Sequence, residues 1–240
     1  MNARSLEGMK SEYGTIRPDR LIRSGNLHDI SDSDVEQLKN AGLKVVIDLR
    51  SPSEHDANPD REMEGVEIIH LPIFDDTMAG VVHEKDTIIR VSKMPEMKGY
   101  YHNLVGQAVI PVWQKIFAIF DEHRNETIGW HCSAGKDRCG ITAYMIEYIL
   151  GVDEQTRMND YIQSNDTFAP RAEMFRQQAL ARGMSEEVAA HIKSLTMVNE
   201  EYMLEAMKYI SENYGTIDAF LLECGVDEQY KQRLREAFLE

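Results

Sequence analysis

The stretch GWHCSAGKDRCGITAYMIEYIL, residues 129–150, joins an apolar segment to an obvious helix through a short polar loop. If Cys132 ends a buried strand and Arg138 begins the helix, the residues between them must turn tightly. Gly135 supplies the backbone freedom that such a turn needs. A loop placed in this way directs its backbone N–H groups inward, at the positive end of the helix dipole. The stretch therefore predicts an anion-binding loop between a strand and a helix.

Cys132 is the candidate nucleophile of this loop. The helix terminus stabilises a thiolate, so we expect a pKa below the roughly 8.5 of a free cysteine. Arg138 offers a planar pair of donors that suits phosphate oxygens and stays charged. A cysteine in an apolar strand is often only a small buried side chain, but the surrounding loop favours catalysis. His131 is expected to hydrogen-bond behind the loop, because a helix-end thiolate needs no separate base.

The segment HCSAGKDRCG, residues 131–140, resembles the His-Cys-five-residues-Arg loop of the cysteine-dependent protein tyrosine phosphatases. It is most similar to the bacterial branch with the HCxxGKDR loop, which includes secreted tyrosine and lipid phosphatases of mycobacteria and listeriae. Other segments look like this branch in the same order and extend the resemblance from about residue 20 to the end. These segments are LIRSGNL, VVIDLRSPSE, HLPIFD, NDYIQSND and VNEEYMLEAMKYISENYGTIDAFLLECGV.

The resemblance implies an α/β fold like that of the protein tyrosine phosphatases. We expect a sandwich with a short central sheet, the phosphate loop between strand and helix, and a helical C-terminal half. The implied activity is phosphomonoester hydrolysis through a phosphocysteine on Cys132, while the loop amides and Arg138 bind the phosphate oxygens. No metal ion or organic cofactor is expected. The residues expected to bind phosphate are Ser133, Ala134, Gly135, Lys136, Asp137 and Arg138.

The expected partner is a phosphorylated protein substrate, with phosphotyrosine as the leading case. Phosphoserine, phosphothreonine and phosphoinositides remain open, and so does the oligomeric state. One rival interpretation is a cysteine phytase-like inositol phosphate hydrolase. Another is a phospho-binding module without turnover, against which the intact Cys132 and Arg138 argue.

Composition limits the remaining function classes. The 240 residues and 27.5 kDa fit a single domain over residues 1–240. A formal net charge of -15 argues against a nucleic-acid surface, which would need a basic patch. The start has no apolar stretch of signal-peptide length, and no apolar run anywhere approaches the roughly 20 residues that span a bilayer. We therefore expect a cytoplasmic protein, with secretion lacking a recognisable signal peptide kept as an alternative.

Three cysteines are too few and too unevenly spaced for a disulfide framework.

Periodicity and turn signals predict strands alternating with helices, followed by helices alone. A capping box at Ser33 and Glu36 and a stop at Gly42 predict a helix near residues 33–41. Strands are predicted at 43–50, 66–73 and 126–132, a loop at 51–65, and a helix at 111–125. The weak pattern of residues 74–106, with Gly, Pro and mixed charge, predicts a long irregular segment with one helical piece. Further helices are predicted at 139–151, 153–165, 170–183, 185–195, 199–215 and 216–225.

The general acid has two main candidates. Asp75, in HLPIFDD, matches the mobile-loop aspartate that the resemblance implies, whereas Asp137 lies inside the phosphate loop. Lys136 and Arg138 flank Asp137 and favour its charged form, which gives a slight preference for Asp75 as the proton donor. Asp76 is a weaker third candidate.

Two loop residues have more than one interpretation. Lys136 either admits polyanionic substrates or pairs with a carboxylate at the rim. Cys139 stands where phosphatase loops usually place serine or threonine, and its weaker thiol donor predicts slow breakdown of the phosphoenzyme. It either fills space in the first helical turn or forms a reversible disulfide with Cys132.

Residues outside the loop complete the expectations. Arg23 and Arg50 either bind phosphate or, as we prefer, tie loops to carboxylates. Residues 168–195 are expected to form a helical pair near the pocket. If that pair is a mobile lid, Phe168, Phe175 and Met184 would cover a bound substrate, and plain core helices are the simpler alternative.

Overall fold

A five-stranded sheet in the order β1-β4-β7-β5-β6 forms the centre of the computed structural model, which describes residues 2–76, 86, 88–89 and 97–240. Strands β4, β7, β5 and β6 run parallel, and β1 pairs antiparallel with β4 at one edge. Strands β2 and β3 form a separate hairpin. The bounds are β1 Arg4–Ser5, β2 Lys10–Ser11, β3 Gly14–Thr15, β4 Leu21–Ser24, β5 Leu43–Asp48, β6 Glu67–His70 and β7 Thr127–His131.

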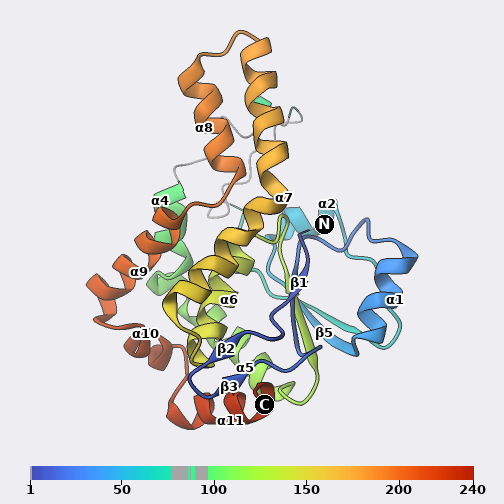
Figure 1. The fold of residues 1–240 in the computed structure, drawn as a ribbon, viewed down its shortest axis with the longest axis vertical. Coiled ribbons are helices and arrows are strands. Elements are labelled where there is room, and N and C mark those ends of the chain that lie inside the picture. Colours follow the sequence, from blue (N-terminus) through green and yellow to red (C-terminus); the bar gives the residue numbers. More distant parts are fainter. Residues whose placement is uncertain (1, 77–85, 87, 90–96) are drawn as a thin grey trace.

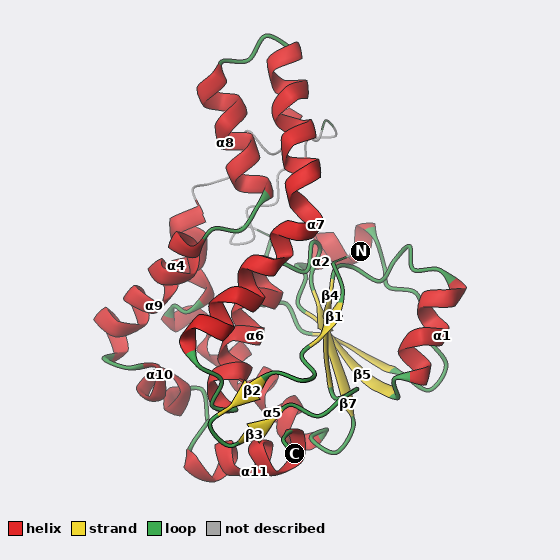
Figure 2. Cartoon of the chain, in the orientation of Figure 1, coloured by secondary structure: helices red, strands yellow, loops and turns green. Residues whose placement is uncertain are grey.

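Helices cover both faces of this sheet (Figures 1 and 2). Helix α1, Asp32–Asn40, packs over a small apolar cluster that includes Leu43 and Val46 of β5. Val45 and Ile47 of the same strand face the large core, to which α5, Ile110–Glu122, and α6, Asp137–Ile149, contribute. The alternation along β5 thus separates two apolar layers.

The C-terminal half is helical. Helices α7 and α8 form an antiparallel pair that projects away from the sheet, at the top of Figure 1. The remaining bounds are α2 Pro52–Ala57, α4 Met97–Leu104, the 3₁₀ helix η1 Gln107–Val109, α7 Glu154–Ala181, α8 Glu186–Thr196, α9 Glu200–Tyr214, α10 Ile217–Glu223 and α11 Glu228–Phe238.

The predicted fold class is confirmed, and the strands predicted at 43–50, 66–73 and 126–132 correspond to β5, β6 and β7. Two strands of the same sheet, β1 and β4, were not predicted. For β4 the reason is Arg23, a charged residue that lies within the strand and is fully buried. Its charge is balanced by Asp160 of α7, a partner that no local sequence pattern reveals.

Two expectations near the N-terminus are wrong in detail. Helix α1 is capped by Ser31, whose hydroxyl accepts from the Asp34 N–H at 3.2 Å, so the capping box is not Ser33 with Glu36. The shorter Asp34 fills the role that glutamate usually takes. The predicted loop at 51–65 contains α2, which begins at Pro52, a favoured first position of a helix.

Two expectations in the helical half also need correction. The segments 153–165 and 170–183 belong to one helix, α7, which continues through Pro170. Pro170 lies on the exposed face, where water can bind the carbonyl that loses its intrahelical partner. Helix α11 was missed, although its buried Tyr230, Leu234 and Phe238 recur at helical spacing.

The expectation for residues 74–106 falls partly outside the described residues, and its described helical piece is α4. Among the helices of the described ranges, none by itself combines the length and apolar composition of a membrane span. The segments Met97–Leu104 and Gln107–Glu122 meet those criteria only when joined across a 47° bend.

Candidate active site

The carboxyl ends of the parallel strands meet at one edge of the sheet, where open α/β sheets usually place their sites. Ser24, Asp48 and His131 end β4, β5 and β7 in mutual register. Cys132 follows directly after β7, and Asp137 begins α6. The structure therefore places the predicted loop between a strand and a helix.

Gly135 lets this loop turn, for two reasons. Its φ is +71°, a backbone conformation that residues with a Cβ rarely adopt. A Cβ atom at this position would also lie 2.6 Å from the backbone of Ser24 and Gly25. No other residue type fits this position without moving β4 away from the loop.

The loop carbonyls point outward, because they accept hydrogen bonds from residues behind the loop. Asn2 Nδ2 donates to the Gly135 carbonyl at 2.9 Å, and Arg23 Nη2 donates to the same carbonyl at 3.1 Å. The backbone N–H of Asn26 donates to the Ser133 carbonyl at 3.3 Å. With its carbonyls engaged on the outer side, the loop turns N–H groups toward its concave side, as an anion site requires.

Cys132 lies at the base of this loop and is 2% exposed. Its pKa is lowered to about 5, first by a hydrogen bond from the Cys139 side chain and then by the charge of Arg138, while burial opposes the shift. The Gly135 N–H also points to the sulfur, at 3.3 Å. The geometry thus favours a thiolate at neutral pH.

Cys139 is the neighbouring thiol that contributes most to the lowered pKa of Cys132. It is fully buried, and burial raises its pKa well above that of an ordinary thiol, so the group keeps its proton. The sulfur also lies 3.5 Å from the Ser24 carbonyl and 3.9 Å from the Trp130 carbonyl. The charged sulfur of Cys132 is a stronger hydrogen-bond acceptor than either of these two neutral carbonyls. Cys132 and Cys139 are both free thiols in this structure.

Arg138 is held by Glu54 of α2. The two terminal nitrogens of the guanidinium bind the two carboxylate oxygens at 2.5 and 2.8 Å. The hydroxyl of Ser133 donates to the same carboxylate at 2.5 Å. Burial opposes ionisation of Glu54, but the bonds and charge of Arg138 outweigh it and lower the pKa to about 2. The carboxylate therefore stays charged and fixes the guanidinium.

One edge of the Arg138 guanidinium remains unused. Glu54 takes the end formed by Nη1 and Nη2, and the Leu49 carbonyl lies 3.4 Å from Nη1. The buried Nε has no acceptor among the described residues. Nε–H and the second proton of Nη2 therefore form a free two-pronged donor of the kind that binds phosphate.

Lys136 and Asp137 bind each other and their surroundings. The Lys136 ammonium lies 2.8 Å from Asp137 Oδ2, and it donates to the carbonyls of Leu195 and Met197 at 3.2 and 3.3 Å. Asp137 Oδ1 accepts from the Tyr101 hydroxyl at 2.8 Å. The loop lysine therefore connects the phosphate loop to the C-terminal end of α8.

The two candidate acids stand in different surroundings. Both carboxylate oxygens of Asp137 accept hydrogen bonds, which holds it as an acceptor. Asp75 is exposed and follows the buried Phe74 in the segment after β6. Asp76 accepts from the N–H and hydroxyl of Ser53 at 3.0 and 2.7 Å. Asp137 is thus fixed inside the loop by two partners, whereas Asp75 lies at the protein surface.

His131 lies behind the loop, as expected. Its Nε2 lies 2.8 Å from Asp60 Oδ2, and the ring is fully buried. Arg50 forms a fork with Asp48, with both distances at 2.8 Å, and also contacts Asp60 at 3.0 Å. These contacts match the structural alternative for Arg50, which ties the loops behind the phosphate loop together.

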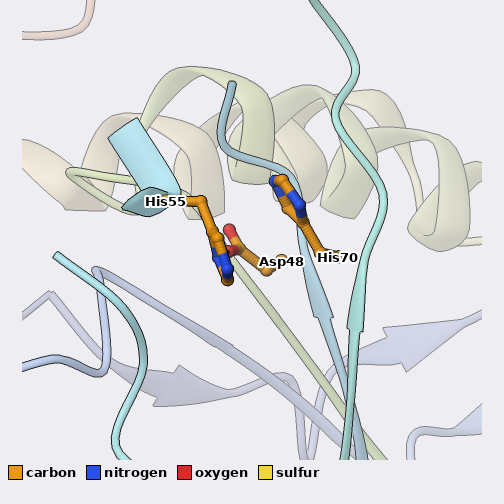
Figure 3. A group of neighbouring side chains, drawn as sticks. All are labelled: Asp48, His55 and His70. Atoms are coloured by element: carbon orange, nitrogen blue, oxygen red, sulfur yellow. The ribbon is translucent and has the colours of Figure 1, made fainter. Parts of the chain in front are cut away.

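Figure 3 shows a group that could in principle hold a metal ion: Asp48, His55 and His70. The two imidazole rings are stacked, with centroids 4.1 Å apart and planes 15° apart. Lone pairs in nearly parallel planes do not converge on one ion, and the Arg50 fork already occupies the Asp48 carboxylate. The group is better suited to fixing α2 and β6 beside the loop.

The helical pair predicted at 168–195 corresponds to the end of α7 and to α8. Phe168 and Phe175 are 9% and 8% exposed, and Met184 is partly buried. These three side chains pack within the protein in this structure, as core residues do.

Sequence reasoning missed two contributors to the site. Glu54 was considered only as a partner of Arg50, although its place in the segment DLRSPSE was noted. No sequence pattern indicated that Tyr101 belongs to the site, because its hydrogen bond to Asp137 joins segments 36 residues apart. Both depend on tertiary contacts.

Comparisons with known proteins place these features in context. The sequence profile described as the tyrosine phosphatase family matches residues 1–240. A Cupriavidus necator protein named as a tyrosine-protein phosphatase is 32% identical over 225 residues, which is 92% of this chain and 80% of that protein. The triple specificity protein phosphatase PtpB of Mycobacterium tuberculosis is 25% identical over 256 residues, 93% of this chain and 92% of its own. A structure of P. aeruginosa TpbA with phosphotyrosine is 13% identical with a TM-score of 0.37, covering 93% of this chain and 99% of that one.

Proposed function

Since the chain belongs to the tyrosine phosphatase family, we propose that it hydrolyses phosphotyrosine in proteins through a phosphocysteine on Cys132. Membership in this family confirms the predicted resemblance to the protein tyrosine phosphatases. The catalytic roles of individual residues rest on the geometry described above.

The observation that carries the proposal is the unused donor edge of Arg138. A buried guanidinium nitrogen without an acceptor costs free energy, unless a ligand completes its hydrogen bonds. The edge belongs to the same short loop as Cys132, whose pKa of about 5 makes it a thiolate. A phosphate monoester can accept from this edge and from the loop amides while its phosphorus faces the sulfur.

In the first step, the Cys132 thiolate attacks phosphorus and forms the S–P bond while the P–O bond to the leaving group breaks. The leaving oxygen takes a proton from a general acid, which we assign to Asp75. The loop amides and Arg138 bind the three remaining phosphoryl oxygens and stabilise their charge in the transition state.

In the second step, water attacks phosphorus, the S–P bond breaks, and inorganic phosphate leaves. The general base accepts one proton of the water, and the sulfur leaves as a thiolate. Cys139 and the Gly135 N–H stabilise that thiolate by donating to it. The thiol is a weaker donor than a hydroxyl, so we expect this second step to limit the rate.

The wider substrate range is also part of the proposal. The name of the M. tuberculosis relative describes a triple specificity phosphatase, and it supports phosphoserine, phosphothreonine and phosphoinositides as further substrates here. Lys136 is the residue through which a second phosphate would be recognised. Because its ammonium is bound to Asp137, Leu195 and Met197, a polyanionic ligand must draw it away from these partners.

The central experiment compares Cys132→Ser and Arg138→Ala with the unmodified protein on an aryl phosphate. Cys132→Ser should abolish turnover and keep phosphate binding, because a helix terminus does not activate a hydroxyl as it does a thiol. Arg138→Ala should lose both. Substantial turnover by Cys132→Ser would falsify the mechanism, and binding without turnover by the unmodified protein would identify a phospho-binding module.

A substrate panel separates the enzyme classes. It contains peptides with phosphotyrosine, phosphoserine or phosphothreonine, phosphoinositides in vesicles, and inositol hexakisphosphate. Lys136→Ala should reduce turnover of phosphoinositides more than turnover of the phosphotyrosine peptide, whereas Lys208→Ala on the exposed face of α9 should change neither. Equal losses on both substrates would remove the selective role of Lys136, and preferred turnover of inositol hexakisphosphate would favour the phytase-like alternative.

A further inference from the structure

An open cavity of about 670 Å³ lies at the end of α6 that is opposite to the phosphate loop. The β2–β3 hairpin, the start of α7 and helices α10 and α11 surround it, in the lower part of Figure 1. Its volume falls within the range of small-molecule sites. Tyr148 lines it from the last turn of α6, on the order of 17 Å along the helix from Asp137. A molecule bound here would not contact Cys132.

Arg157 of α7 lines this cavity, and two of its guanidinium nitrogens have no hydrogen-bond acceptor among the described residues. It is 6% exposed, and its guanidinium lies over the rings of Tyr144 and Tyr148, at 4.4 and 5.0 Å from their centroids. Its Nε and Nη1 are buried without an acceptor in the described part of the chain. Cation–π contacts compensate the charge but leave the N–H groups unsatisfied. A buried guanidinium in this state calls for an external acceptor.

Arg235 of α11 approaches the same cavity from the other side. Its guanidinium lies 3.9 Å from the ring centroid of Tyr13, and its Nε donates to the Ile149 carbonyl at 2.8 Å. Its two terminal nitrogens form no hydrogen bond within the described ranges, so they remain able to donate. The cavity therefore has donors on two walls and an aromatic ring beside each of them.

Four acidic side chains line the cavity as well, and they formally balance its four basic ones. Three of them already have partners in the protein. Lys231 binds Asp218 and Glu228 at 2.6 and 2.7 Å, and Asp153 is the N-cap of α7. The two guanidinium groups thus keep free donors although the cavity is formally neutral.

We propose that this cavity is a second binding site, and that it takes a small organic phosphate monoester. The phosphate would accept hydrogen bonds from Arg157 and Arg235, and the organic part would pack against Tyr13 and Tyr148. A phosphate suits the site better than a carboxylate, because three oxygens can serve two guanidinium groups that approach from different walls.

The test uses phenyl phosphate as the probe and the Cys132→Ser protein, which does not consume it. Backbone amide shifts are followed by NMR during the titration, with sodium chloride of matched ionic strength as the blank. Two separate groups of amides should shift, one around Gly135 in the loop and one around Gly151 beside the cavity. Shifts confined to the loop would overturn the proposal, while shifts confined to the cavity would count only against the proposed loop function.

Variants then assign the second group of shifts. Arg157→Met keeps the apolar stem and should weaken binding at the cavity about tenfold or more, with no change at the loop. Arg235→Met should do the same and serves if Arg157→Met does not fold. Arg176→Met, at the far end of α7, is the matched control and should change neither site. Unchanged shifts around Gly151 in both cavity variants would contradict the assignment.

Discussion

The carboxylate of Glu54 binds both terminal nitrogens of Arg138, at 2.5 and 2.8 Å, although 84 residues separate the two in the sequence. This two-point ion pair orients the guanidinium so that its Nε edge is left free. The short helix α2 therefore helps to position Arg138, the arginine that we propose binds phosphate. The pair also links the stability of this region to pH, because the pKa of Glu54 is lowered to about 2.

Removing the Glu54 charge should impair catalysis. Glu54→Gln keeps the shape but weakens the hold on Arg138, and we expect kcat/KM for an aryl phosphate to fall on the order of tenfold to a hundredfold. Glu62→Gln, an exposed carboxylate in the following loop, is the control and should be neutral. Unchanged kcat/KM in Glu54→Gln would show that Arg138 needs no such support.

The same variant tests the pH dependence of stability. A folded pKa of about 2 against a reference value of 4.5 corresponds to about 3 kcal/mol of stability. Because the folded pKa is the lower one, this contribution is present above about pH 4.5 and is lost as the pH falls toward 2. Urea unfolding should therefore show a large difference between the unmodified protein and Glu54→Gln at pH 7, and less than half of that difference at pH 3. A pH-independent difference would contradict the linkage.

The hydrogen bond from Cys139 should control the reactivity of Cys132. Alkylation of Cys132 by iodoacetamide should show a midpoint at about pH 5. Cys139→Ala removes the donor and should move that midpoint upward, whereas Cys139→Ser keeps a donor and should leave it low. Cys224→Ala is the control, since burial raises the pKa of that thiol to about 12. A common midpoint in all four proteins would exclude the role of Cys139.

The general acid can be identified from leaving groups. Asp75→Asn should lower kcat/KM, which reports the first step, on the order of a hundredfold for phenyl phosphate and much less for p-nitrophenyl phosphate, and it should flatten the basic limb of the kcat/KM pH profile. A good leaving group needs little protonation, which explains the difference. Asp137→Asn should keep the basic limb, since that residue is held as an acceptor by Tyr101 and Lys136. The reverse pattern would assign the acid to Asp137.

A buried acid in α6 predicts a second pH effect. Glu147 is fully buried, and no described residue donates a hydrogen bond to its carboxylate oxygens. Burial and the nearby Asp160 carboxylate raise its pKa well above the usual value. The folded protein keeps this proton while the unfolded chain releases it above about pH 4.5, so stability falls as the pH rises toward the folded pKa.

Glu147→Gln removes the titration and should raise Tm at pH 8 while changing it little at pH 4.5. Differential scanning calorimetry measures this, with the exposed Glu122→Gln as the control. A lower Tm at pH 8 in Glu147→Gln would indicate that the charged form is stabilised.

The sequence by itself determined the strand–loop–helix arrangement of residues 129–150 and most of the elements around it. Cys132, Gly135 and Arg138 are close in the chain, so a joint role could be predicted from local rules about turns, helix termini and donor geometry. The same holds for β5, β7 and α6, whose apolar patterns are continuous. Structure that depends on local interactions can be predicted without the rest of the fold.

Tertiary structure decided the features that depend on contacts between distant segments. The charge of Arg23 interrupts the apolar pattern by which β4 would be predicted as a buried strand. Asp160 balances this charge from a helix more than a hundred residues later in the chain. The hold of Glu54 on Arg138 and the bond of Lys136 to the end of α8 have the same origin. Burying a charge is favourable only where a partner is brought within hydrogen-bond distance, and that partner is chosen by the packing of the whole chain.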